Sequence, residues 1–366
     1  MPWVTRRYSK GEIDRAGKAL ITLAQDDPAR QEAIAKVDNW RSCHAYPLQV
    51  IKMTLKRRAR KIDKDALIAQ RLKRRASIEI KLRDNPNMKL SQMQDIGGCR
   101  AVLKTVKQVE RLVKRYKKYH AKSPKDRSRW DGSEDFDYIR QPKPDGYRSI
   151  HLIFRFQSPS AERKCFNDER IEIQVRSRLQ HLWATAVETA QVFTGQALKS
   201  KVKTASEEWL RFFALTSSAF AFRENSPLVP GTPEDRGDLI EELKCIVEKE
   251  NIMNILWGWN STIHLLEEKL EAKKMEDPYV FLLTLNPAKR TLRTKPFGKD
   301  ELDVAQREYD AAEKEFESDP DIQVVLVAVE DVAALPKAYP NYYADTSDFM
   351  DAVQLEIAAT QKATAK

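Results

Sequence analysis

Cysteine is scarce in this sequence of 366 residues, and the four that occur stand far apart with no C-x-x-C pair among them. This spacing argues against a disulfide framework and against a structural zinc site. We therefore expect buried free thiols at Cys43, Cys99, Cys165 and Cys245.

Long apolar runs are missing as well. The first ten residues are basic and contain no apolar segment of the signal-peptide kind, and the longest aliphatic run extends only from Val324 to Val329. A membrane-spanning helix needs about 20 apolar residues. The sequence therefore predicts a soluble protein of the cytoplasm with no membrane partner.

The familiar signatures of nucleotide-binding loops, G-x-x-x-x-G-K-[ST] and G-x-G-x-x-G, are also absent. Positive charge is present in excess, with a formal net charge of +10 and a pI near 9.2. The basic residues gather at 56–61, 71–75 and 114–122, whereas 300–321 is acidic. This distribution favours a polyanionic ligand, although clustered cations are also typical of ordinary solvated helix faces.

Hydrophobic periodicity predicts helices at the start of the chain and a longer helix from Asp65, capped by Asp63 or Asp65. In that helix Lys73, Ser77 and Lys81 recur every four residues, so they would share one face. Two ammonium groups beside a hydroxyl suit a triphosphate. An ordinary basic helix face is the alternative.

Two predicted strands present acidic residues among polar neighbours. Asp95 stands at the mouth of one strand, where Gly97 and Gly98 allow the backbone to approach a ligand closely, and it is a candidate metal ligand. In the stretch RIEIQVR, residues 170–176, apolar and polar residues alternate and place Glu172 at mid-strand. That polar face is either the floor of an active site or the solvated side of an antiparallel strand.

A turn with the sequence PKPDGY precedes another predicted strand. Its two prolines fix φ, Asp145 and Gly146 supply the reversal, and Tyr147 is delivered to the lip of the sheet. An aromatic ring in this position can stack on a nucleobase or pack in the core, and the residues of the turn leave both possibilities open.

Prolines and glycines between Pro227 and Gly237 interrupt the pattern and indicate a domain boundary. We expect one domain at 1–226, a helical connector at 227–276 and a second domain at 277–366. The second domain has the pattern of a small α+β module, with a hairpin, a helix, a buried strand and a final helix at 279–297, 300–317, 322–329 and 347–359.

Four motifs occur in one order along the chain: R-x-K-x3-S-x3-K at 71–81, DIGGCR at 95–100, PKPDGYRSIH at 142–151 and IEIQVR at 171–176. Together they resemble the synthetase domain of the RelA/SpoT family, which includes the small alarmone synthetases. The resemblance implies an α/β (α+β) fold, with a mixed β-sheet flanked by helices. It also implies an enzyme that moves pyrophosphate from ATP to a ribose 3′-hydroxyl.

The resemblance assigns a role to each motif residue. The adenine would lie between Arg71 and Arg100. The ATP phosphates would be held by Lys73, Ser77 and Lys81. Asp95 and Glu172 bind Mg²⁺, and Glu172 also activates the acceptor hydroxyl. The acceptor base stacks on an aromatic ring with three polar side chains nearby: Tyr147, with Lys143, His151 and Gln174. Transfer of this kind requires neutralised phosphates, a bridging cation and an aligned hydroxyl.

The C-terminal region carries a second resemblance. The sequence holds five histidines and none precedes an aspartate, so the hydrolase half of the long family members is not expected. Residues 324–353 resemble the C-terminal region of the fused toxic small alarmone synthetases, the CapRel-like toxin–antitoxin proteins. In that group the N-terminal domain pyrophosphorylates the 3′ CCA end of tRNA, and a pseudo-zinc-finger-like antitoxin region without zinc controls it. A phage protein, such as a capsid protein, opens the switch.

Tyr339 and Tyr342 match the Y-x-x-Y element of that group, which plugs the ATP site, and packing against the last helix is their alternative role. The leading interpretation is therefore an autoinhibited tRNA pyrophosphotransferase of phage defence, with no DNA partner. A conventional synthetase of ppGpp or pppGpp, with GDP or GTP as acceptor, shares all four motifs. A catalytically silent nucleotide- or RNA-binding regulator is the third possibility, and the presence of both carboxylates disfavours it.

Overall fold

The computed structural model describes residues 3–122, 128–130, 136–194, 207–257, 280–286, 291–316, 319, 322–327 and 346–364. The chain begins with three helices, α1 (Lys10–Thr22), α2 (Pro28–Cys43) and α3 (Ala45–Arg60). A capping box starts α1, because the Ser9 hydroxyl accepts from the Glu12 N–H at 3.3 Å and the Glu12 carboxylate accepts from the Ser9 N–H at 2.8 Å. The helices predicted at the start of the chain are confirmed.

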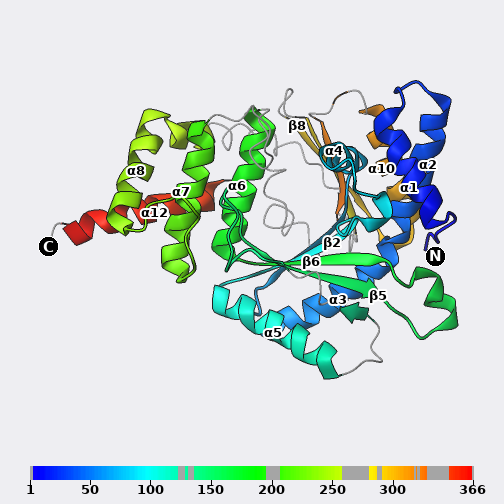
Figure 1. Ribbon diagram of the computed structural model, residues 1–366, viewed down its shortest axis with the longest axis horizontal. Helices are drawn as coiled ribbons and strands as arrows, with labels where there is room; N and C mark the ends of the chain where they lie inside the picture. The colour runs from blue at the N-terminus through cyan, green and yellow to red at the C-terminus, as the bar shows by residue number, and fades with distance from the viewer. Residues whose placement is uncertain are drawn as a thin grey trace.

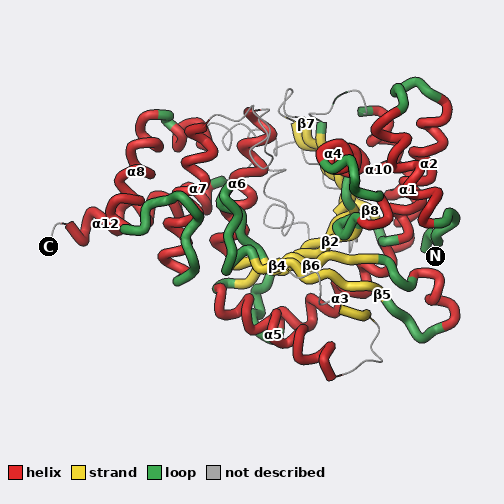
Figure 2. The backbone as a smooth tube through the Cα atoms, viewed as in Figure 1, coloured by secondary structure: helices red, strands yellow, loops and turns green. Residues whose placement is uncertain are grey.

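Nine strands of the described part form one sheet (Figure 2). In chain order they are β1 (Leu67–Leu72), β2 (Gly97–Leu103), β3 (Ser128–Trp130), β4 (Phe136–Asp137), β5 (Ile150–Phe156), β6 (Arg170–Ser177), β7 (Val280–Asn286), β8 (Thr291–Phe297) and β9 (Gln323–Val327). The spatial order is β3-β5-β6-β2-β1-β9-β7-β8, and β4 pairs with β5. β2 and β6 run parallel, whereas the other pairs run antiparallel. The mixed sheet expected of an α+β protein is confirmed.

Helices lie on both sides of the central strands (Figure 1). α3 and α5 (Val106–Lys122) cover one face, and the alternation in β6 sends Ile171, Ile173 and Val175 into the core that these helices share. The intervening Glu172 and Gln174 line a cavity on the other side, together with a residue of α6 (Arg178–Thr194). The predicted alternation is confirmed, and its polar face lines a cavity.

A second group of helices forms its own apolar core. α7 (Glu207–Glu224), α8 (Arg236–Lys249) and α12 (Ser347–Thr364) pack with α6. Phe349 of α12 is only 1% exposed, and its ring lies against the rings of Phe212, Phe213 and Phe220 on α7. Figure 1 shows α12, in red, beside α7 and α8 at the end of the molecule opposite the N-terminal helices. The predicted final helix is confirmed, and it completes this core.

The remaining C-terminal elements are also found where the sequence predicts them. They are the hairpin β7–β8, the short 3-10 helix η3 (Lys299–Glu301), α10 (Leu302–Glu315) and β9. β9 pairs with β7 on one side and with β1 on the other, where Arg71 is the partner of Val327. These strands therefore continue the main sheet, whereas the domain boundaries expected at 226 and 276 stay predictions.

The helix predicted from Asp65 is wrong in its first half. Residues 67–72 form β1 and pair with β2 from Leu67 opposite Val102 to Leu72 opposite Gly97, and α4 begins only at Arg75 (Arg75–Asp84). Pairing with a distant strand outweighs the local helical pattern. The Asp63 carboxylate accepts from the backbone N–H groups of Asp65 and Lys104, so it stabilises a turn and caps no helix.

Two of the four cysteines are also placed differently from the expectation. Cys43 and Cys99 are buried free thiols as predicted, whereas Cys165 and Cys245 are exposed. Cys165 belongs to a short surface 3-10 helix, η2 (Ala161–Phe166), and Cys245 lies on α8, which buries Leu239, Ile240 and Leu243. A further 3-10 turn, η1, spans Leu90–Gln92. No described helix is long and apolar enough to cross a membrane.

Candidate active site

One cavity of about 210 Å³ lies over β1, β2 and β6 and collects most of the predicted site residues. Seven of them line it: Arg71, Lys73, Asp95, Arg100, Tyr147, Glu172 and Gln174. Strand register explains the convergence, because Gly98 and Arg100 of β2 pair with Glu172 and Gln174 of β6. A Cβ atom on Gly98 would lie 4.0 Å from a Glu172 oxygen, so the glycine keeps the cavity floor open beside this carboxylate.

Asp95 is held between two ammonium groups. Lys73 Nζ donates to one carboxylate oxygen at 2.8 Å and Lys81 Nζ donates to the other at 2.9 Å. Burial opposes ionisation of this side chain, but the two lysines outweigh it and hold the pKa of Asp95 well below its usual value. Burial also lowers the pKa of Lys73, against the attraction of Asp95. The result is an ionised carboxylate within a cationic surround.

Glu172 is held by different partners. His151 Nδ1 lies 2.8 Å from one Glu172 oxygen, and Gln174 Nε2 donates to the other at 2.8 Å. Burial again disfavours the charged form, but His151 and its hydrogen bond lower the pKa of Glu172. A carboxylate only accepts, so Nδ1 carries a hydrogen and directs it at Glu172. His151 Nε2 lies 2.8 Å from the Tyr147 hydroxyl.

The turn that carries Tyr147 is held in place by contacts with α7. Gly146 has a φ of +94°, and a Cβ atom there would lie 2.8 Å from the Trp183 ring, so only glycine fits. Ser217 Oγ donates to the Gly146 carbonyl at 2.6 Å. Tyr147 itself is 9% exposed and touches Trp183, yet it also lines the cavity. The ring therefore packs against Trp183 and also lines the cavity, and its stacking on a base stays a prediction.

Four predicted residues do not line this cavity, and three of them lie close to it. His151 and Lys81 reach it through Glu172 and Asp95, as described above. Lys143 Nζ lies 5.3 Å from the Tyr147 ring centroid. Ser77 instead lines a separate cavity of about 470 Å³ at the start of α4. Lys73 precedes α4, so Lys73, Ser77 and Lys81 do not share one helix face. The predicted regulatory residues Tyr339 and Tyr342 lie outside the described residues.

Two further charged residues line the cavity and were not predicted as site residues. Arg176 continues the alternation of Glu172 and Gln174 along β6, and this periodicity was the signal that could have identified it. Glu188 comes from α6, and nothing in the sequence links this helix position to the strands. Their presence adds one cation and one carboxylate to the wall.

The residues of the cavity suit a magnesium ion that takes few of its ligands from the protein. In the described part of the chain no group of three or more histidine, cysteine, aspartate or glutamate side chains is arranged to hold a metal. Mg²⁺ in phosphoryl-transfer sites usually takes only one or two carboxylates from the protein and completes its shell with phosphates and water. Asp95 and Glu172, both ionised and lining one cavity, suit that mode.

The C-terminal helix α10 is connected to the segment from Lys73 to Arg75 through a buried network. Arg41 of α2 is 1% exposed and donates from Nε to the Lys73 carbonyl at 3.0 Å. Its other nitrogens reach Glu313 at 2.9 Å and the Tyr309 hydroxyl at 2.6 Å. Glu313 also accepts from the backbone N–H of Arg75, the first residue of α4, at 3.1 Å. Burial opposes ionisation of Glu313, but Arg41 holds its pKa below the usual value.

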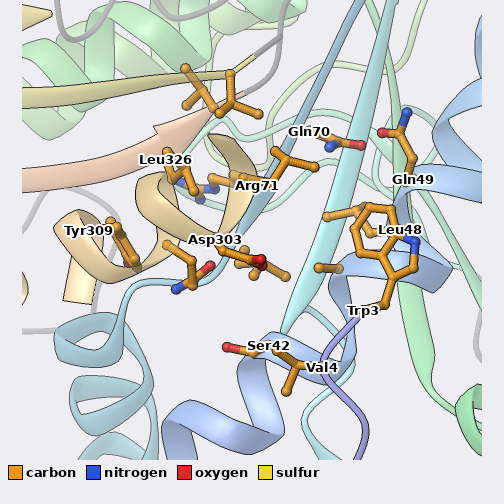
Figure 3. A pocket seen from close by; sticks show the side chains of 16 residues that line it. Trp3, Val4, Ser42, Leu48, Gln49, Gln70, Arg71, Asp303, Tyr309 and Leu326 are labelled. Carbon is orange, nitrogen blue, oxygen red and sulfur yellow. The ribbon is translucent and has the colours of Figure 1, made fainter. Parts of the chain in front are cut away.

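A mainly apolar pocket of about 120 Å³ lies beside this network, where β1 and α3 meet α10 and β9 (Figure 3). Tyr309 and Asp303 line it from α10, Leu326 from β9 and Leu48 from α3. Arg71 lines both this pocket and the cavity. The C-terminal elements therefore lie close to Arg71, a residue that also lines the cavity.

Comparison with known proteins agrees with this geometry. Residues 70–194 match the family described as the region found in RelA / SpoT proteins. The matched stretch begins within β1 and ends with α6, so it contains β2, β6 and the second half of β1. No curated protein sequence matches the chain. The chain thus contains, at residues 70–194, a region that matches RelA/SpoT proteins.

Several solved structures are similar over half of the chain. Small alarmone synthetase 2 from Bacillus subtilis is 19% identical, with a TM-score of 0.42, over 51% of this chain and 93% of its own. Small alarmone synthetase 1 from the same organism is 20% identical, with a TM-score of 0.41, over 52% and 93%. A GTP pyrophosphokinase family protein from Streptococcus pneumoniae is 18% identical, with a TM-score of 0.40, over 51% and 89%.

Proposed function

We propose that this pyrophosphotransferase, whose RelA/SpoT region spans residues 70–194, transfers pyrophosphate from ATP to the 3′ CCA end of tRNA and thereby blocks translation. The observation that carries the chemistry is the convergence of two ionised carboxylates, a cationic surround and a tyrosine on one cavity. We place the reaction in the cytoplasm, where ATP and tRNA meet.

On the donor side, the ATP phosphates take the place of Asp95 as partners of the lysine ammonium groups. Lys73 and Lys81 then neutralise the triphosphate, while Asp95 becomes available as a metal ligand with Glu172. Bound Mg²⁺ supplies further neutralisation of the charge that develops on the transferred phosphates. Arg71 and Arg100, which both line the cavity, hold the adenine between their guanidinium planes.

On the acceptor side, Tyr147 holds the terminal base and Glu172 receives the proton of the ribose 3′-hydroxyl. The 3′-oxygen attacks the β-phosphorus of ATP, the bond from that phosphorus to the bridging oxygen of the α-phosphate breaks, and AMP leaves. His151 keeps Glu172 oriented through its hydrogen bond at 2.8 Å. Positioning and charge stabilisation supply most of the catalysis in such transfers.

The choice of tRNA as acceptor is supported by the charge of the surface. α5 exposes Lys107, Arg111, Lys114, Lys117 and Lys118, and the adjoining end of α3 exposes Arg57, Arg60 and Lys61. Arg58 of α3 lies 4.4 Å from the Tyr116 ring centroid on α5, so the two sets of exposed cations belong to adjacent helices. A nucleoside diphosphate is too small to use these cations, whereas the acceptor stem of tRNA carries phosphates well beyond its 3′ end.

Label transfer from γ-labelled ATP tests the acceptor. We expect label on deacylated tRNA that ends in CCA, little on GDP or GTP, and none on tRNA trimmed of its terminal adenosine. The rate on tRNA should fall steeply with salt. Label on GDP or GTP with little on tRNA would contradict the tRNA proposal and identify an alarmone synthetase.

Charge variants sharpen this test. Changing Lys114, Lys117 and Lys118 to Ala should weaken use of tRNA and lower its salt dependence by roughly one unit for each tRNA phosphate that the variant no longer neutralises. α5 lies across the sheet from the cavity, so ATP binding should not change. The matched control changes Lys10, Arg15 and Lys18, which are exposed on α1, and should leave both properties as in the wild type.

The second part of the proposal is control by the C-terminal region as a fused antitoxin. The contacts of Glu313 and Tyr309 with Arg41 and with the start of α4 support it, because they connect α10 to the segment that carries Lys73. A phage protein that binds residues 277–366 would relieve the inhibition and stop translation in the infected cell. The plug predicted at Tyr339 and Tyr342 stays a prediction.

A further inference from the structure

Arg176 has more hydrogen-bonding capacity than the protein uses. It is 3% exposed, it lies at the end of β6 and it lines the cavity. Its Nη2 donates to the Tyr147 hydroxyl at 2.7 Å and to the Gln174 carbonyl oxygen Oε1 at 2.9 Å. Its Nε and Nη1 are buried and find no hydrogen-bond partner in the part of the chain that the structure describes.

Burial of a guanidinium whose N–H groups lack acceptors costs free energy, unless a ligand supplies those acceptors. The group stays charged at every physiological pH, and a buried charge without a partner is strongly unfavourable. The nearest acidic residue of the same strand face, Glu172, is already engaged by His151 and Gln174. An anion that enters the cavity would supply the missing acceptor.

The surroundings indicate which end of the cavity the anion would occupy. The Arg176 guanidinium carbon lies 5.1 Å from the Tyr147 ring centroid, and Lys143 Nζ lies 5.3 Å from the same centroid. Two cations therefore accompany the ring that is expected to hold the acceptor base. The lysines expected to bind the donor phosphates are instead bonded to Asp95.

We infer that Arg176 binds a phosphoryl oxygen of the acceptor, next to the ribose that is modified. The inference rests on the proposed function and adds a binding residue to its acceptor side. The guanidinium keeps two N–H donors, on Nε and Nη1, without a partner in the described part of the chain, and phosphoryl oxygens accept charge-assisted hydrogen bonds from such donors. Two acceptors present this chemistry: RNA has a phosphodiester 5′ to its terminal ribose, and GDP or GTP has its 5′-phosphates.

Binding to pairs of probes with and without the phosphate tests this role. The full-length protein is first saturated with α,β-methylene ATP, which fills the donor site without transfer. The affinities of CpA and adenosine, and of GDP and guanosine, are then measured by calorimetry. In the Arg176→Gln protein we expect the phosphate-bearing probe of the preferred pair to lose roughly 10- to 100-fold in affinity, the range of a charge-assisted hydrogen bond. The nucleoside should stay within about twofold.

Two further variants separate binding from support of Tyr147. Arg176→Lys keeps a positive charge and should recover part of the lost affinity. Tyr147→Phe removes one partner of Arg176 and should lower the affinity of both members of a pair alike. Thermal unfolding of each variant checks that it is folded. If the Arg176→Gln protein does not fold, the affinities are compared between the Arg176→Lys protein and the wild type.

The outcomes are distinct. Loss confined to CpA supports Arg176 as a ligand of the RNA phosphate, and loss confined to GDP supports it as a ligand of the nucleotide phosphate. Equal losses for nucleoside and nucleotide, or no loss at all, would overturn the inference while leaving the proposed function standing. Failure of the wild-type protein to bind any of the four probes would overturn the acceptor site itself.

Discussion

The two buried carboxylates of the cavity are ionised because of the side chains that contact them. Asp95 and Glu172 are both buried, and burial alone would favour their neutral forms. The ammonium groups of Lys73 and Lys81 reverse this for Asp95, and His151 does so for Glu172. Each carboxylate therefore keeps its charge for a different reason, which suits two carboxylates with different tasks.

A third buried carboxylate, Glu169, has partners too weak to outweigh its burial. Glu169 is 1% exposed, and burial raises its pKa to about 7 despite Arg6 at 3.4 Å. His44 Nε2 lies 3.4 Å from it, but burial lowers the pKa of His44 to about 4. The two groups lie within ion-pair distance, yet burial favours the neutral form of each, so the contact is uncharged between about pH 4 and pH 7.

This contact gives a prediction on stability. A raised pKa means that the contribution of Glu169 is complete below about pH 4.5 and is lost as the pH rises through about 7. The Glu169→Gln protein cannot ionise there. Its free energy of unfolding, measured by urea denaturation, should gain on the wild type between pH 5 and 7 by at most about 1.4 kcal/mol per pH unit. Parallel pH profiles for the two proteins would contradict the assignment.

At the scale of the element, α10 is where we propose that the C-terminal region acts on the site. Glu313 accepts from the first backbone N–H of α4 and shares a cavity with Ser77, which is expected to hold a donor phosphate. The start of a helix attracts anions, so a carboxylate placed there competes with a phosphate for the same partial charge.

The corresponding prediction concerns ATP affinity. Glu313→Gln keeps the shape of the side chain and removes the charge, so ATP should bind roughly 3- to 10-fold more tightly, equivalent to about 1 kcal/mol. Calorimetry with α,β-methylene ATP measures the change without interference from transfer. Glu315→Gln alters an exposed carboxylate of the same helix and serves as the control. Equal affinity in both variants would show that α10 does not influence the donor site.

The helices and strands also show which parts of the fold could be predicted from the sequence. The alternation of RIEIQVR predicted β6 and its polar face correctly, because a strand with one apolar face has a period that survives in any context. The same alternation places Arg176 on the polar face, but the sequence alone suggested no role for it in the site. The stretch before α4 was predicted wrongly as a helix because β1 depends on pairing with β2 some thirty residues later, and a local pattern does not contain that information.

At the scale of the whole molecule, the C-terminal region is part of the fold that carries the site. β9 extends the central sheet beside β1, and α12 fills the core formed by α6, α7 and α8. Removal of residues from about Pro278 onward would therefore expose the edge of β1 and the apolar surface under Phe349. A test of autoinhibition by truncation would confuse release with unfolding, and point variants in α10 avoid this.

The activity that we propose depends on the two carboxylates of the cavity. Asp95→Asn and Glu172→Gln conserve size and remove charge, so the proteins should stay folded by circular dichroism. Total transfer from γ-labelled ATP to a mixture of deacylated tRNA, GDP and GTP is then compared with that of the wild type. A Glu162→Gln protein, changed at an exposed carboxylate of η2, is the control and should behave as the wild type. We predict a loss of roughly 100-fold or more in each cavity variant, whereas transfer near the wild-type rate in either would contradict the assignment of this cavity as the active site.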